Sequence, residues 1–243
     1  MKPKKFNKEK SFVYRINLIS FLFLSIFFIL NISGDKKKDF LFGSIVKSQN
    51  WEIDRVRNME IFTGNVKFRN SDYLLESDKA LYNHKTETWD IDGNVYCDKK
   101  FEDGTAVETF CDKAIYMDKS REAFMYSQDK QVKTIYYLKD NRKIISLSNK
   151  SHAQNESKKI QLEGNLKIFT DSATITGNKG LYEALTGEFT ISENRPFVIG
   201  ENENYNLYLE SDIIKLNKET QIIEAINKVK GSIYNKAVYY KEK

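Results

Sequence analysis

The stretch SDKALYN at residues 77–83 returns as CDKAIYM at 111–117 and as GNKGLYE at 177–183. Two looser copies, SNKS at 148–151 and SDII at 211–214, share the opening of this pattern. In the three closer copies a small residue precedes a tyrosine by two positions, and residues two apart in a strand lie on the same face. A small side chain beside a large one suits a packed or ligand-filled interior. The repetition indicates a scaffold of similar strand units.

A second motif, Gly-Asn followed by an aliphatic residue, occurs at 64–66, 93–95 and 164–166. Glycine and asparagine both tolerate positive φ, so the pair predicts a tight turn or a bulge in a strand. The surrounding segments, such as Thr88–Ile91 and Glu188–Ile191, are short and rich in aromatic and β-branched residues. Turn-forming residues separate them, and no long segment of the body has a helical apolar period. The body is therefore predicted to be all-β.

The N-terminal segment has a different composition. Ile16 to Gly34 contains no charged residue, and the fifteen residues before it hold six basic side chains against one acidic. An apolar stretch of this length can form one membrane-spanning helix, whose cationic flank should stay in the cytoplasm. Ile32 stands where a cleavage site needs a small residue, which favours an uncleaved anchor, and a cleaved signal peptide stays open. In both cases the body lies outside the cytoplasm.

These features divide the chain into four parts: a cytoplasmic basic segment at 1–15, a transmembrane anchor at 16–34, a linker at 35–54 and a β-domain at 55–243. The chain holds 39 Lys and Arg against 34 Asp and Glu, and the whole excess lies in the first part. Because the body lacks a basic surplus, we expect no nucleic acid among the partners.

The two cysteines, Cys97 and Cys111, flank Asp103-Gly104, a strong hairpin signal. A three-residue loop would pair the cysteines directly, whereas a two-residue loop would pair Cys97 with Phe110. The sequence is compatible with a disulfide and with two half-buried thiols. Two cysteines without a nearby histidine fall short of a zinc site.

The sequence offers little support for an enzyme. It contains no nucleophile-elbow, phosphate-binding-loop, dinucleotide-binding or zinc-protease motif. Asp78, Asp112 and Asp212 share one phase of the repeat, but Asn149 and Asn178 replace them in the other copies. This substitution favours capping of turns or strand edges over a column of metal ligands. We expect no catalysis, no metal site and no cofactor.

The succession of Gly-Asn-Val, Ser-Asp-x-Ala-x-Tyr and Gly-Asn-Val resembles the OstA-like domain of the lipopolysaccharide-transport proteins. The resemblance is clearest over Ile61–Tyr116 and looser over 140–183 and 205–231. It implies a twisted, partly open β-roll (a β-jellyroll) of repeated short antiparallel strands, following one N-terminal transmembrane helix. The apolar N-terminus favours the membrane-anchored LptC type over the soluble LptA type, whereas the length of the body leaves both open.

The resemblance also implies a function. Acyl chains of lipopolysaccharide would lie between two facing sheets, and open edge strands would pair head-to-tail with the next protein. The chain would connect an inner-membrane ABC exporter complex to a periplasmic OstA-like bridge protein, with its body in the periplasm and one pass through the bacterial inner membrane. The alternative is a β-repeat structural or adhesion protein of the envelope or cell surface that carries no lipid.

Ten residues are predicted to contact the acyl chains, because each is apolar or aromatic and lies at a repeated motif position. They are Val66, Phe68, Ala80, Tyr82, Val95, Ala114, Tyr116, Leu166, Ile168 and Tyr182. A one-residue shift in register would turn any of them to the opposite face. The stretch Gly231–Tyr240 has strand-forming residues and no proline. It is predicted either to be the edge to which a partner strand adds or to pack against its own sheet.

Overall fold

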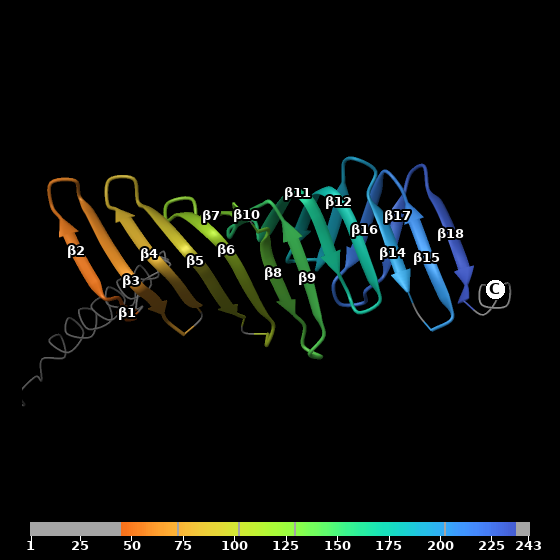
Figure 1. The fold of residues 1–243 in the computed structure, drawn as a ribbon, viewed down its shortest axis with the longest axis horizontal. Coiled ribbons are helices and arrows are strands. Elements are labelled where there is room, and N and C mark those ends of the chain that lie inside the picture. Colours follow the sequence, from red (N-terminus) through yellow and green to blue (C-terminus); the bar gives the residue numbers. More distant parts are fainter. Residues whose placement is uncertain (1–44, 72, 102, 129, 202, 237–243) are drawn as a thin grey trace, which may run out of the picture. The chain divides into compact units, whose positions relative to one another are not determined.

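The computed structural model describes residues 45–236 apart from residues 72, 102, 129 and 202. The regular elements bounded within this part are eighteen antiparallel strands, which confirms the prediction of an all-β body (Figure 1). In the same part of the chain, no helix has the length and apolar character needed to cross a membrane. The predicted anchor at 16–34 and the basic segment at 1–15 lie outside the described residues.

Six strands are eleven to thirteen residues long: β3 (Met59–Arg69), β4 (Tyr73–Asn83), β5 (Thr88–Lys100), β6 (Ala106–Met117), β11 (Lys159–Phe169) and β12 (Ala173–Glu183). The other twelve have three to six residues: β1 (Ile45–Lys47), β2 (Asn50–Asp54), β7 (Glu122–Tyr126), β8 (Val132–Tyr137), β9 (Lys143–Ser148), β10 (Lys150–Gln154), β13 (Glu188–Ser192), β14 (Phe197–Glu201), β15 (Tyr205–Glu210), β16 (Ile213–Asn217), β17 (Ile223–Ile226) and β18 (Lys230–Asn235). The prediction of short strands throughout is wrong for the long six, because the chain continues as a strand through the Gly-Asn-aliphatic motif in β3, β5 and β11 and through the copies of SDKALYN in β4, β6 and β12.

The strands form two sheets that share the long strands. The first sheet runs β2-β3-β4-β5-β6-β7-β10-β11-β12-β13-β16-β17, and the second runs β1-β3-β4-β5-β6-β8-β9-β11-β12-β14-β15-β18. Each long strand contributes one half to each sheet; β3, for example, pairs with β2 through its first half and with β1 through its last residues. Strands β1 and β2 occupy residues 45–54, so the sheets extend into the segment predicted to be a linker.

The corner between the two sheets is formed by the Gly-Asn pairs. The φ angles are +79° and +49° at Gly64-Asn65, +78° and +47° at Gly93-Asn94, and +78° and +48° at Gly164-Asn165. The register of the ladder shifts at each of these pairs. An extra residue in one strand bends it and increases its twist, so these bulges turn the chain from one sheet into the other. Of the two conformations predicted for the pair, the bulge is the correct one.

The Ser-Asp-Lys copies lie at the same corner on alternate strands. The Asp78 carboxylate accepts a hydrogen bond from the Asn94 amide at 2.9 Å, and the Asp112 carboxylate accepts one from the Gln128 backbone N–H at 2.8 Å. These acidic side chains therefore cap the corner of the neighbouring strand, as the repeat pattern predicted. The step between copies varies because each step spans two strands and two hairpins of different length.

Side chains from both sheets fill the space between them and form two apolar clusters. The N-terminal cluster contains Phe62, Val66, Phe68, Leu75, Ala80, Trp89, Ile91, Val95, Cys111, Ala114, Tyr116 and Val132. The C-terminal cluster contains Tyr136, Leu138, Ile144, Leu162, Leu166, Ile168, Ile175, Tyr182, Phe189, Ile191, Val198, Ile214 and Leu216. The sheets face each other across these clusters, since the ring of Phe68 in the second sheet lies 5.2 Å from that of Trp89 in the first.

The close packing at the corner predicts that alanine lowers the free energy of unfolding by different amounts at two glycine positions. A Cβ atom added to Gly93 would lie 2.8 Å from the Cβ of Asp78, whereas one added to Gly104, which also has positive φ, would have no neighbour within 4 Å. Both changes to alanine should lose about 1 kcal/mol of unfolding free energy to backbone strain. Gly93→Ala should lose roughly a further 1–2 kcal/mol by crowding Asp78. Urea unfolding of the two variants measures the difference, and equal losses would show that the corner does not require this close approach.

Candidate functional site: the interior between the sheets

All ten residues predicted from the motifs lie on the inner faces of the two sheets. Ala80, Tyr82, Ala114, Tyr116 and Tyr182 come from the first sheet, and Val66, Phe68, Val95, Leu166 and Ile168 from the second. Nine of them are buried, and Tyr82 is half-buried against the N-terminal cluster. The register assumed for the motif positions is therefore correct, while contact with lipid stays a prediction.

Aromatic rings line the interior away from the corner. In the N-terminal cluster, the ring of Trp89 lies 4.6 Å from that of Tyr82. In the C-terminal cluster, the ring of Tyr182 lies 5.0 Å from that of Tyr136 and 4.5 Å from that of Phe189, so the two sheets meet through these rings. Burial raises the pKa of the Tyr136 and Tyr182 phenols, and the nearby Lys218 ammonium partly offsets the rise at Tyr182. Both phenols stay neutral at physiological pH.

The motifs miss much of the C-terminal interior. Ile144, Ile175, Phe189, Val198 and Leu216 are fully buried there but belong to no repeated motif. Alternation of inward and outward residues along each strand is the signal that would identify them. In β13, for example, Phe189 and Ile191 face inward, while the residues on either side of them are only partly buried.

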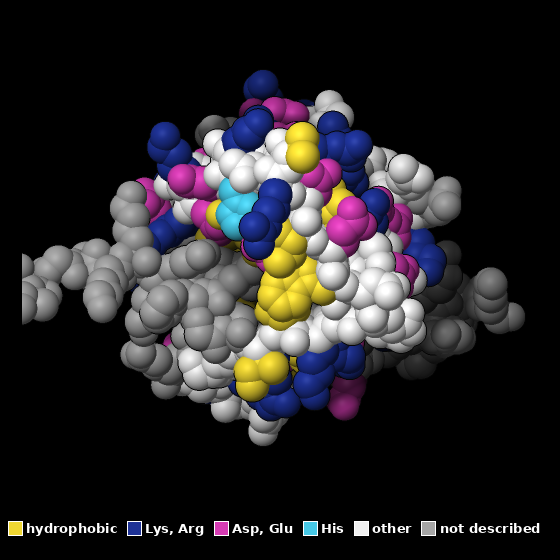
Figure 2. All heavy atoms as spheres, turned by 90° about the vertical axis from the view of Figure 1, so that its left-hand side faces the viewer, with side chains coloured by type: hydrophobic (Ala, Val, Ile, Leu, Met, Phe, Trp, Pro, Cys, Tyr) yellow, Lys and Arg dark blue, Asp and Glu magenta, His cyan; other side chains and the backbone are white. Residues whose placement is uncertain are grey.

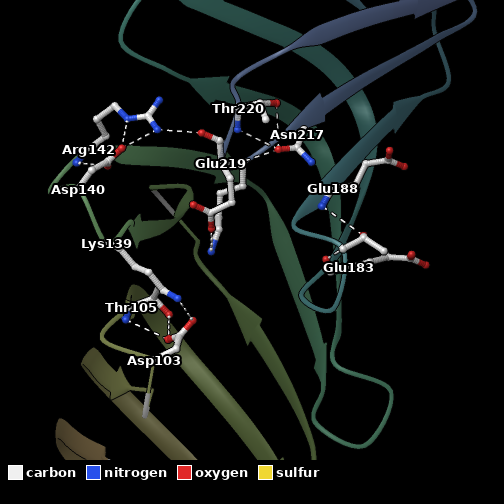
Figure 3. Close-up of polar contacts among 12 residues, drawn as sticks. Asp103, Thr105, Lys139, Asp140, Arg142, Glu183, Glu188, Asn217, Glu219 and Thr220 are labelled. Carbon is white, nitrogen blue, oxygen red and sulfur yellow. Dashed lines mark hydrogen bonds and ion pairs between the residues drawn. The ribbon is translucent and has the colours of Figure 1, made fainter.

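Opposite the corner, the hairpin tips of the two sheets form the mouth of the interior, and in the C-terminal half polar contacts bridge this mouth (Figure 3). The Arg142 guanidinium donates a hydrogen bond at 2.8 Å to the backbone carbonyl of Glu219, across from the other sheet. The Asp140 carboxylate forms an ion pair with this guanidinium, with 2.6 Å between Oδ2 and Nη2. Hydrogen bonding to the guanidinium keeps the pKa of the Asp140 carboxyl below its usual range. The hairpin tip that contains Glu219 is itself stabilised by the side chain of Asn217, whose amide oxygen Oδ1 accepts a hydrogen bond from the Thr220 backbone N–H at 2.9 Å.

The interior reaches the surface at both ends of the sheets. Trp51 and Ile53 on β2 have exposed fractions of 59% each, and Ile233 on β18 has 69%, although all three lie on inner faces. Figure 2 views the β2 end, where hydrophobic side chains gather in the middle of the face and charged side chains surround them. The structure gives β2 and β18 one neighbouring strand each within the described residues. Among residues 45–236, each end therefore combines a strand edge that no further strand joins with exposed apolar side chains.

The two cysteines carry free thiols. Cys97 pairs with Thr109 and Cys111 pairs with Val95, so the cysteines are diagonal neighbours on β5 and β6. Both predicted hairpin registers are wrong. The observed turn is centred earlier in the chain than the two predicted ones, by half a residue and by one residue. A hydrogen bond from the Phe101 N–H to the Thr105 carbonyl closes it. Burial raises the pKa of each thiol to about 12. The thiolate needed for oxidation or metal binding is therefore scarce at neutral pH.

A shallow polar groove lies outside the corner of the C-terminal half, and its lining includes Asn149, Glu163 and Asn178. Within the described residues no group of three or more His, Cys, Asp or Glu side chains is arranged to hold a metal ion. The apolar interior remains the main candidate site.

Comparison with known proteins gives a family match over most of the β-body. Residues 45–188 match the family model described as the LptA/(LptD N-terminal domain) LPS transport protein. No curated protein matches the chain. Among solved structures, the chain is similar to LptH of Pseudomonas aeruginosa, the LptA-homologous periplasmic component of a lipopolysaccharide transport device. The identity is 11%, the coverage is 79% of this chain and 94% of LptH, and the TM-score is 0.26.

The family model covers more than half of the chain and spans the strands that carry the clearest motifs. It confirms the resemblance seen in the sequence, and it places the role of the protein, at the level of the family, in lipopolysaccharide transport. The chain belongs to the LptA/LptD N-terminal domain family of lipopolysaccharide transport proteins.

Proposed function

We propose that this protein carries lipopolysaccharide with the acyl chains between its two sheets and hands it to the next β-roll protein through a sheet edge. The observation that carries the proposal is the apolar interior, which extends from β2 to β18 and ends in exposed apolar side chains on both sides. Burial of acyl chains in such an interior is favourable by about 25 cal/mol per Å² of apolar surface removed from water.

Loading requires the two sheets to part, because side chains already fill the interior. The sheets are joined at the corner, where the register shifts of the bulges interrupt the ladders. Rotation about this corner separates the sheets with little loss of ladder hydrogen bonds. In the C-terminal half the contact between Arg142 and Glu219 must break, so we propose that chains enter first through the N-terminal half.

Photo-crosslinking at two neighbouring residues tests the proposed cargo. Tyr82 and Leu81 are adjacent on β4 and point to opposite faces of the first sheet. A photoreactive amino acid at position 82 should crosslink to lipopolysaccharide in cells, and the same amino acid at position 81 should not. Equal crosslinking at the two positions would rule out the interior site. Absence of lipid at both would favour a β-repeat structural protein of the envelope.

The partners and location follow from the same proposal. The unpaired edges of β2 and β18 would pair with an inner-membrane ABC exporter complex on one side and a periplasmic OstA-like protein on the other, by addition of strands. The interior is mostly apolar, which suits a carrier without catalytic activity.

We also propose that the N-terminus stays attached as a single-pass anchor in the inner membrane, with residues 1–15 in the cytoplasm. The uncharged stretch Ile16–Gly34 and its basic flank support this arrangement. N-terminal sequencing of the protein from native membranes should begin at the first residues of the chain. A mature N-terminus near Asp35 would contradict the anchor and leave the β-body as a soluble periplasmic protein.

A further inference from the structure

Three hydroxyl side chains form a row across the inner face of the second sheet. Thr109 on β6 is the direct partner of Thr134 on β8, and Thr134 is the direct partner of Ser146 on β9. Side chains of direct partners on adjacent antiparallel strands have their Cβ atoms about 5 Å apart, so the three hydroxyls form one short ladder. Along the same row of the sheet, Phe68, Leu75 and Cys97 precede the hydroxyls, and Ile168 and Ile175 follow them.

The hydroxyls of this row are buried but poorly satisfied. Thr134 and Ser146 have exposed fractions of 3% and 1%, and the Ser146 Oγ has no hydrogen-bond partner among the described residues. The Thr109 and Thr134 hydroxyls contact each other at 3.5 Å, the long limit for a hydrogen bond. The Tyr136 phenol lies beside Ser146 and is also without a partner of hydrogen-bonding geometry in the described structure. A buried hydroxyl without a partner destabilises the fold unless a ligand or water completes it.

The other buried serines of this interior differ in this respect: Ser148 on β9 and Ser151 on β10 also have hydroxyls without a hydrogen-bond partner among the described residues, whereas Ser77 and Ser211 are satisfied by the protein itself. The Ser77 hydroxyl donates to the carbonyl of Lys79 at 3.2 Å, and the Ser211 hydroxyl donates to that of Ile213 at 2.7 Å. Ser77 and Ser211 open copies of the repeat at the corner, and so does Ser148. Ser146 lies two residues away from the corner, inside a regular strand, so its hydroxyl points between the sheets. The unmet serine hydroxyls, at Ser146, Ser148 and Ser151, therefore all lie on β9 and β10, in the middle of the interior.

The row lies where the two apolar clusters meet. Val132, next to Thr134 on the inner face of β8, belongs to the N-terminal cluster, and Tyr136 on its other side belongs to the C-terminal cluster. On the inner face of the first sheet, β7 and β10 contribute the small side chains of Ala123, Ser151 and Ala153 together with the longer Met125. The middle of the interior thus offers hydroxyl donors beside small side chains, with apolar surface on either side.

We propose that this hydroxyl row binds the carbonyl groups by which acyl chains are linked to their headgroup, as esters or amides. The carbonyl oxygens accept from Thr134, Ser146 and Tyr136, while the hydrocarbon chains run in both directions into the two apolar clusters. The row thereby fixes how far along the interior the headgroup sits. This proposal rests on the proposed function, since it specifies which part of the lipid the interior recognises and where.

The test compares two lipids that differ only in their carbonyl groups. Full-length protein in a mild detergent is titrated with a synthetic acyl-ester lipid A and with its analogue in which ether linkages replace the esters. The double variant Thr134→Val/Ser146→Ala removes two hydroxyls at nearly constant shape, and Thr176→Val, on the outer face of β12, is the matched control. Urea unfolding of each lipid-free variant accompanies the titrations.

We expect wild type and Thr176→Val to bind the ester lipid roughly tenfold more tightly than the ether lipid, as one or two hydrogen bonds predict. The double variant, which keeps the Tyr136 phenol, should lose most of this preference for the ester lipid and, without lipid, should be at least as stable as wild type. Equal binding of both lipids by wild type would overturn the hydroxyl row but leave lipid carriage intact. Binding of neither lipid by wild type would overturn both proposals.

Discussion

Replacing Phe189 with alanine should lower the free energy of unfolding by about 3–5 kcal/mol. Phe189 is fully buried, and its ring lies 5.2 Å from that of Tyr136 in an edge arrangement and 4.5 Å from that of Tyr182. Removing the ring leaves a cavity at the point where both sheets contact each other, and the surrounding strands are too constrained to close it. Urea unfolding followed by circular dichroism measures the loss.

The matched control is Phe110→Ala. The Phe110 side chain lies on the outer face of β6 with an exposed fraction of 38%, and it contacts the ring of Tyr96 at 5.0 Å. Its removal should cost no more than about 1 kcal/mol, because water already reaches the ring. If the two variants lose similar stability, the space between the sheets is not the main apolar core of the protein.

Replacing Ile233 with proline should abolish capture of the periplasmic partner while leaving the roll folded. The Lys236 N–H donates to the Asn204 carbonyl at 2.9 Å, which marks 236 and 204 as a hydrogen-bonded pair. Bonded and non-bonded pairs alternate in an antiparallel ladder, so the N–H of Ile233 points away from β15. Proline at this position removes an outward donor and obstructs an added strand, and edge strands tolerate it. Pull-down of a soluble OstA-like protein by the full-length variant should fall at least about tenfold.

Ser232→Pro provides the control for this variant. The N–H of Ser232 points toward β15, so proline there should remove a bond within the sheet and lower the melting temperature. Undiminished partner capture by the folded Ile233→Pro variant would show that β18 is not the docking strand. Deleting residues 231–243 would be a blunter test of the same edge, because it removes nearly the whole of β18.

The sequence predicts the interior well where the motifs repeat. The Asp-Lys-Ala-x-Tyr pattern places Ala80 and Tyr82 on one face, and the pairing of β4 with β3 confirms that this face is the inner one. The bulge at the corner determines which residues face inward, and it can be located in the sequence because two consecutive residues with positive φ require particular residue types such as Gly and Asn. Motifs of this kind can be read locally, without knowledge of the partner strand.

Features that depend on pairing between strands could not be predicted in the same way. The register of the hairpin at Asp103 differs from both predicted registers by a shift too small for turn residues to specify, and it separates Cys97 from Cys111. The row of Thr109, Thr134 and Ser146 arises only when three strands are aligned. A buried threonine in a single strand does not by itself predict a binding site. The row can be recognised only when the residues paired with the threonine on the neighbouring strands are known.

The order of the strands has a consequence for how the chain is made. In each sheet a strand pairs only with strands near it in sequence, and no pairing skips more than two strands. Each strand therefore pairs only with strands close to it in chain order, which favours folding that extends from a finished edge one strand at a time. A β-body that leaves a membrane pore from its β1 end onward can thus fold as it emerges, and its growing edge stays open until the last strand is in place.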